Sequence, residues 1–136
     1  MLCLDSYVMM DALSDIKERS TKAQKYLEEA SLAGGVISST VLTEVFFQIA
    51  KRKNIEDAYK ALHFIESIEN LEILEVSRDI AVSAGNLRTK YYKNKSREIS
   101  YLDCIHLATG ILAGCKKFVT GDRDFRGVEE IEVEIY

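Results

Sequence analysis

Short apolar runs alternate with longer helix-forming stretches along this 136-residue chain. The apolar runs predict buried strands at 2–4, 36–38, 71–76 and 118–119. A fifth strand, at 131–135, is predicted to lie at an edge because Glu132 and Glu134 alternate with apolar residues. Apolar residues at helical spacing predict helices at about 7–13, 20–32, 40–51, 55–68, 78–92 and from 100 onward. Strands that alternate with helices favour a parallel sheet covered by helices on both faces.

Length and composition predict one globular domain over residues 1–136. Hydrophobic residues make up 47% of the chain, proline is absent, and no linker or repeat interrupts it. No apolar run approaches the roughly 20 residues of a membrane span, and the N-terminus lacks the features of a signal peptide. We therefore expect a cytoplasmic protein without a membrane partner. Cys3, Cys104 and Cys115 lack disulfide or zinc spacing and are expected to be buried.

The net charge of −4 leaves the class of ligand open. A nucleic-acid-binding protein usually carries an excess of basic residues, which this chain lacks. Two bound divalent ions would, however, bring the net charge to zero. Charge therefore neither supports nor excludes nucleic-acid binding.

Four acidic residues occupy positions that a parallel sheet brings together. Asp5 directly follows the first predicted strand and Asp122 the fourth, and functional crevices of such sheets lie beyond the carboxyl ends of the strands. Glu44 and Asp103 lie early in helices that follow loops on the same side. Four convergent carboxylates repel one another unless a cation lies among them. Mg²⁺ and Mn²⁺ prefer such oxygen ligands, and carboxylate-held ions hydrolyse phosphodiesters.

Each of these acids also has a purely structural interpretation. Asp103 with Ser100 fits a capping box, and Asp5 can cap the helix that follows it. Asp122 with Gly121 fits a turn, and Glu44 fits a solvated helix flank. These alternatives remain open at this stage.

At these residues the sequence resembles the PIN-domain nucleases, in particular the VapC-type toxins of toxin–antitoxin pairs. The resemblance covers the chain in order: Leu2-Cys3-Leu4-Asp5-Ser6, then Glu44, then Asp103 before Ala108, then Thr120-Gly121-Asp122-Arg123-Asp124-Phe125. It implies a three-layer α/β/α PIN-like domain with sheet order 3-2-1-4-5. It also implies a Mg²⁺- or Mn²⁺-dependent endoribonuclease with one or two ions, a homodimer and a cognate antitoxin.

Within this resemblance, further residues receive supporting roles. Ser6 and Thr120 are expected to hold the acids by hydrogen bonds, and Asp124 to be a secondary or water-mediated ligand. His106 has no fixed counterpart in the family and is predicted to lie on the helix surface.

An RNA substrate also requires contacts to its phosphates. Five basic residues interleaved with two tyrosines precede the helix that carries Asp103: Arg88, Lys90, Lys93, Lys95 and Arg97. They are candidates for RNA binding, with a solvated basic loop as the alternative. Arg123 either offsets the charge of the neighbouring acids or contacts a phosphate.

Other classes of protein fit less well. A phosphoacceptor receiver domain needs an acidic pair after the first strand and a lysine after the fifth, and a haloacid-dehalogenase-type phosphatase needs an aspartate at residue 7, where Tyr7 stands. Two alternatives within the PIN fold remain: an RNA-processing or decay nuclease outside a toxin–antitoxin pair, and a non-catalytic binding module.

Overall fold

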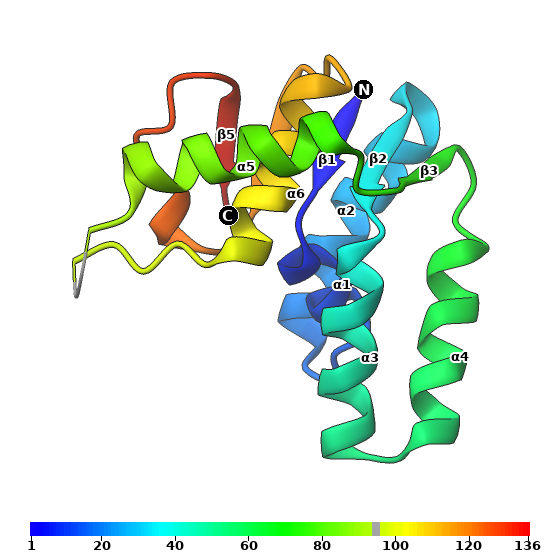
Figure 1. Ribbon diagram of the computed structural model, residues 1–136. Helices are drawn as coiled ribbons and strands as arrows, with labels where there is room; N and C mark the ends of the chain where they lie inside the picture. The colour runs from blue at the N-terminus through cyan, green and yellow to red at the C-terminus, as the bar shows by residue number, and fades with distance from the viewer. Residues whose placement is uncertain (94–95) are drawn as a thin grey trace.

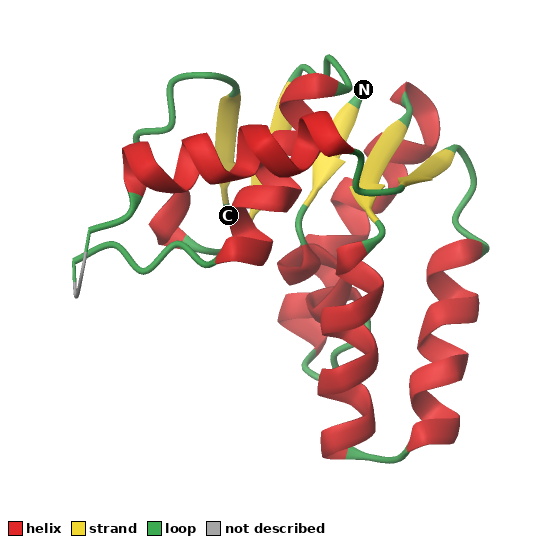
Figure 2. Ribbon diagram, viewed as in Figure 1, coloured by secondary structure: helices red, strands yellow, loops and turns green. Residues whose placement is uncertain are grey.

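The computed structural model describes residues 1–93 and 96–136, in which a five-stranded sheet is surrounded by six α-helices (Figures 1 and 2). The elements follow one another in the alternating order that the sequence predicts. Their bounds are β1 Leu2–Leu4, α1 Ser6–Ala12, α2 Lys17–Ala33, β2 Gly35–Ser38, α3 Thr40–Arg52, α4 Ile55–Glu66, β3 Leu71–Leu74, α5 Arg78–Tyr91, α6 Tyr101–Leu112, β4 Lys117–Thr120, the 3-10 turn η1 Arg123–Phe125, and β5 Glu132–Ile135.

All neighbouring strands are parallel, and their order is β3-β2-β1-β4-β5. The predicted order is thereby confirmed, and β5 is the predicted edge strand. Cys3 of β1 pairs in register with Val36 of β2 on one side and Phe118 of β4 on the other. Beyond these strands, the main-chain N–H of Asp5 donates to the carbonyl of Val119 at 3.0 Å. The carboxyl ends of β1 and β4 therefore lie side by side.

Alternate residues of the central strand enter two separate cores, which makes the three layers. Leu2 and Leu4 pack in a cluster with residues of α1, α2, α3 and α4. Cys3, pointing the other way, packs with residues of α5 and α6. Figure 2 shows the sheet between these two groups of helices. Burial on both faces explains why β1 reads as a continuous apolar run.

Helix α6 approaches β1 closely, and a glycine makes this approach possible. A Cβ atom placed on Gly110 would lie 2.7 Å from the Cβ of Cys3, too close for any side chain. The residues one and two turns earlier in α6, His106 and Asp103, are thereby held near the end of β1. All three cysteines are buried and free, as predicted.

Three predicted boundaries were wrong by two or more residues, and one of them is the end of α4, which lies at Glu66 rather than at Ile68. Helix α2 begins at Lys17 rather than near Ser20, because its first turn is made of exposed charged residues that carry no apolar periodicity. Strand β3 ends at Leu74, so Val76 lies outside it.

Helices α3 and α4 form a hairpin that extends beyond the sheet (Figure 1). Within the described ranges, no helix combines the length and the apolar character that a membrane crossing requires.

Candidate metal centre

Asp5 is the central acid of the candidate site and is only 2% exposed. Its Oδ2 accepts a hydrogen bond from the Thr120 hydroxyl at 2.7 Å, and its Oδ1 lies 2.9 Å from His106 Nδ1. The Ser6 hydroxyl donates to Oδ1 at 3.5 Å. Although Asp5 occupies the N-cap position of α1, its carboxylate forms no capping bond within the described residues. Helix capping therefore does not explain why an aspartate is placed here.

Thr120, the last residue of β4, connects Asp5 to Asp122. Its hydroxyl donates to Asp5 and accepts a hydrogen bond from the main-chain N–H of Asp122 at 3.0 Å. Asp122 Oδ1 in turn accepts from the N–H of Asp124 at 2.8 Å and so caps η1. Burial raises the pKa of Asp122, and the negative charges of Asp124 and Asp5 raise it further. Asp122 therefore belongs to a turn and also lies close enough to Asp5 for the charge of Asp5 to raise its pKa.

Asp103 lies in the first turn of α6 and forms the capping box that its spacing indicates. Its Oδ2 accepts from the main-chain N–H of Ser100 at 2.9 Å, and the Ser100 hydroxyl accepts from the N–H of Asp103 at 3.0 Å. Burial nevertheless raises the pKa of Asp103 to about 6, against the opposing hydrogen bonds, and the charges of Asp5 and Asp122 contribute to the rise. Even with the capping hydrogen bonds, the charged form of Asp103 is therefore less favourable in the folded protein than in water.

His106 lies inside the site rather than on the helix surface, so the prediction for this residue was wrong. It is fully buried, with Nδ1 at 2.9 Å from Asp5 Oδ1 and Nε2 at 3.3 Å from Glu44 Oε1. Burial alone would lower its pKa, but the hydrogen bond to Asp5 and the charges of the neighbouring carboxylates raise it overall. The sequence does hold a signal for this position, because His106 lies one helical turn after Asp103 in a helix flanked by apolar residues.

Glu44 reaches the site from the second turn of α3. Burial raises its pKa, the charges of Asp5 and Asp103 add to the rise, and His106 opposes it. Glu44 Oε1 and His106 Nε2 are both buried, and neither has a well-aligned hydrogen-bond partner in the described part of the chain. Buried polar atoms without partners are uncommon in proteins and call for a specific explanation.

A metal ion supplies such an explanation. Asp5, Asp103 and His106 each offer a ligand atom, and these atoms lie within 4.8 Å of one another. The two unpartnered atoms of Glu44 and His106 lie 3.3 Å apart. This distance is close to the roughly 3 Å between adjacent ligand atoms of an octahedral ion whose ligand bonds are about 2.1 Å long. Carboxylates whose charges oppose one another gain stability from a cation between them. The residues therefore fit a metal-binding site.

Two of the predicted RNA-binding residues are committed to contacts within the fold. The Arg88 guanidinium donates through Nε to the carbonyl of Ile99 at 3.2 Å and stacks on the rings of Tyr92 and Tyr101. Lys90 forms ion pairs with Glu129 and Glu130 at 3.4 and 3.1 Å. These contacts tie α5 to the segments that precede α6 and β5.

The remaining basic candidates differ in their surroundings. Arg97 is only partly exposed, contrary to the expectation of an exposed loop, because its guanidinium donates to the carbonyls of Asp124 and Arg126. Lys93 and Arg123 are exposed. Lys95 lies outside the described residues.

The sequence matches the PIN domain family over residues 2–131. Among solved structures, VapBC2 from Rickettsia felis bound to a promoter DNA fragment is similar, with a TM-score of 0.75, 24% identity, and 98% of this chain and 96% of that chain covered. VapC20 from Mycobacterium tuberculosis, a toxin that cleaves the sarcin–ricin loop, gives a TM-score of 0.75 at 20% identity, with coverage of 97% and 99%.

A toxin–antitoxin complex from Klebsiella pneumoniae gives a TM-score of 0.66 at 25% identity, with coverage of 96% and 93%. No curated protein sequence gives a significant match. The family match spans nearly the whole chain, and the sheet has the strand order that the resemblance implies. The chain therefore belongs to the PIN domain family.

Proposed function

We propose that this chain is a metal-dependent endoribonuclease that acts as the toxin of a type II toxin–antitoxin pair. One observation carries the proposal: carboxylates from four separate segments gather at the end of the central strands, where Asp5, Asp103 and His106 offer ligand atoms within 4.8 Å of one another. The charge of Asp5 raises the pKa of each of the other three carboxyls. A fold does not need such mutually repelling charges, whereas a site that holds divalent ions for phosphodiester hydrolysis does. The residues are Asp5, Glu44, Asp103 and Asp122.

The proposed cofactor is Mg²⁺ or Mn²⁺, as one or two ions. Asp5, Glu44, Asp103 and Asp122 would hold it, with Asp124 as a secondary or water-mediated ligand and His106 as an additional nitrogen donor. When bound, such ions lower the pKa of an attacking water and neutralise charge on the leaving oxygen. Each proposed acid ligand has a role in that chemistry only as an ionised carboxylate.

The residues around the acids would hold them in position. Thr120 and His106 contact opposite oxygens of Asp5 and so restrict rotation of its carboxylate. Ser100 does the same for Asp103 through the capping box. A site whose ligands are fixed beforehand loses less entropy when a metal or substrate binds.

The toxin role rests on the similar structures, which include toxins and toxin–antitoxin complexes. By analogy we propose a cognate antitoxin as inhibitor, a homodimer, and one nuclease domain over residues 1–136 acting on RNA in the cytoplasm. The alternatives are a PIN-type processing or decay nuclease outside such a pair and a non-catalytic PIN-fold module.

Expression of the wild type and of Asp122→Asn tests the proposal. The wild type should arrest growth and fragment cellular RNA, whereas the variant should accumulate as a folded protein without doing either. Asp79→Asn, an exposed acid in the first turn of α5, is the matched control and should behave like the wild type. RNA cleavage without growth arrest would favour the processing enzyme, and RNA binding without cleavage would favour the binding module.

A further inference from the structure

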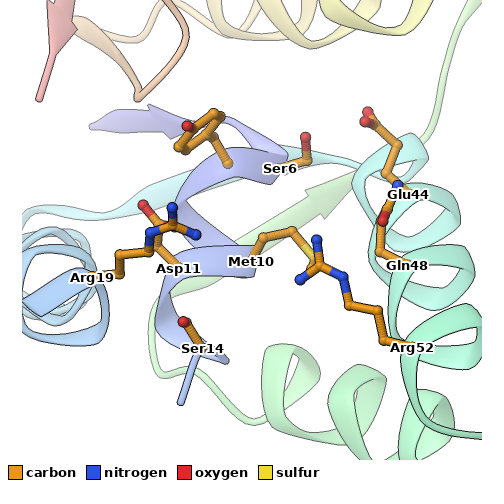
Figure 3. Close-up of a pocket in the computed structure, with 9 residues that line it drawn as sticks. Ser6, Met10, Asp11, Ser14, Arg19, Glu44, Gln48 and Arg52 are labelled. Atoms are coloured by element: carbon orange, nitrogen blue, oxygen red, sulfur yellow. The ribbon is translucent and has the colours of Figure 1, made fainter. Parts of the chain in front are cut away.

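A cavity of about 300 Å³ opens beside the candidate metal centre, between α1, the start of α2, and α3. Ser6 and Glu44, of which Glu44 is itself a proposed ligand, lie at one end of it (Figure 3). Arg52, at the end of α3, extends its guanidinium toward Met10 of α1, and Arg19 comes from α2. Two arginines from different helices thus line a cavity that is continuous with the acids.

These two arginines have no carboxylate partner in the described part of the chain, where ion pairs involve other bases. Besides Glu44, the acid that lines the cavity is Asp11, which is buried and already accepts a hydrogen bond from the Tyr136 hydroxyl at 2.9 Å. By contrast, Arg88 and Lys90 are occupied by contacts within the fold. The cavity therefore holds two guanidinium groups that form no ion pair with any described residue, together with the carboxylates of Asp11 and Glu44.

Tyr7 supplies an aromatic wall to the same cavity. Its ring packs against the main chain of Gly121, where a Cβ atom would meet the ring at only 2.3 Å. It also meets the ring of Tyr136 edge to face, with centroids 6.4 Å apart. The side chain remains 44% exposed despite these contacts. An aromatic ring that is held by packing and remains partly exposed is the type of surface on which RNA bases and sugars stack.

We propose that this cavity is a nucleotide subsite, in which Arg19 and Arg52 bind a phosphate adjacent to the one cleaved and Tyr7 packs against the attached nucleoside. The inference rests on the proposed function, since it assumes that RNA reaches the acids. A guanidinium binds phosphate oxygens through two parallel hydrogen bonds and keeps its charge at every physiological pH. Contacts to a flanking phosphate would position the strand without making binding specific for a base sequence.

Binding of a fluorescein-labelled single-stranded oligoribonucleotide of mixed sequence tests the subsite by fluorescence anisotropy. The measurements use the Asp122→Asn background, so that the strand is not cut during titration, over a range of salt concentrations. Arg19→Ala, Arg52→Ala and the double variant are compared with Lys17→Ala and Lys51→Ala. These controls remove the same charge from the same helices, but neither lysine lines the cavity.

Each arginine variant is expected to weaken binding about tenfold, as removal of a charge-assisted hydrogen bond does. The slope of log affinity against log salt should fall by about 0.7 for each phosphate of the single strand that the variant no longer neutralises. Changes below about twofold are expected for the controls, whose charges stay in solvent. Thermal unfolding of every variant confirms that binding is weakened without damage to the fold.

Arginine variants that bind like the lysine controls would overturn the proposal and leave the cavity to an acidic segment of a protein partner. In that case Asp122→Asn could still abolish cleavage, so the proposed function would stand. If the background binds no oligoribonucleotide in any form, both the subsite and the proposed function are wrong.

Discussion

Replacing Asp103 by Asn should make the metal-free protein more stable at neutral pH. The pKa of this carboxyl is raised from 3.8 to about 6, chiefly by burial. The folded state therefore binds the proton more tightly than the unfolded chain, and stability decreases as pH rises between these two values. By pH 7 the full cost of holding the charge is present. Asn removes that charge and still offers an oxygen to accept the hydrogen bond from Ser100.

The magnitude follows from the two pKa values. Their difference corresponds to about 3 kcal/mol at 1.36 kcal/mol for each pKa unit. Partial exposure lets water screen part of this cost, so we expect a gain of about 1–3 kcal/mol in the free energy of unfolding. His106, whose own pKa is raised partly by the charge of Asp103, reduces the gain slightly in the variant.

Urea unfolding, followed by far-ultraviolet circular dichroism with EDTA present, measures this effect. The difference between Asp103→Asn and the wild type should be near its maximum at about pH 7.5 and should shrink toward zero near pH 4, where both side chains are neutral. Asp79→Asn should change stability by less than about 0.5 kcal/mol at either pH, because Asp79 is exposed. A variant less stable than the wild type at neutral pH, or a difference that does not change with pH, would refute the reasoning.

Four further predictions address the surroundings of the site. Millimolar Mn²⁺ should raise the melting temperature of the wild type but not of Asp5→Asn or Asp103→Asn, because a ligand stabilises only the state that binds it; differential scanning fluorimetry measures this, and equal shifts in all three would place the ion elsewhere. Thr120→Val should cost about 1–3 kcal/mol in urea unfolding, since Asp5 and a main-chain N–H lose their partner, whereas Thr120→Ser should retain most of the stability. His106→Ala should cost more at pH 6 than at pH 9 in the same assay, because the raised pKa of His106 gives stability at acidic pH that is lost as pH rises through that pKa; a pH-independent cost would contradict the ion-pair role. Gly110→Ala should lower the melting temperature by forcing α6 away from Cys3, and an unchanged value would show that the two elements separate without cost.

Much of the fold could be predicted because buried positions are occupied by apolar residues, whose spacing distinguishes strands from helices. Strand β1 is apolar at every position since Leu2 and Leu4 face one core and Cys3 the other. The position of Asp5 beyond that strand follows from the same run of residues. The start of α2 shows no apolar pattern, because the residues of its first turn contact solvent rather than a core.

Contacts between distant segments account for what the sequence could not predict. His106 is buried because α6 packs closely on β1, which depends on Gly110 and Cys3 rather than on the residues next to the histidine. Arg97 reads as part of a basic loop, yet its guanidinium bonds to carbonyls about 30 residues further along the chain. No local pattern specifies such partners.

The structural and functional interpretations of the acids, which the sequence presents as alternatives, hold together in the structure because a carboxylate has two oxygens. Asp103 caps α6 through Oδ2, and Asp122 caps η1 through Oδ1. A cap satisfied by one oxygen fixes the carboxylate while its second oxygen stays available as a ligand. Asn keeps one acceptor oxygen but carries no charge, so Asn variants separate the two roles. If Asp103→Asn and Asp122→Asn keep the folded structure and lose Mn²⁺ binding, these acids are retained for their charge rather than for their caps.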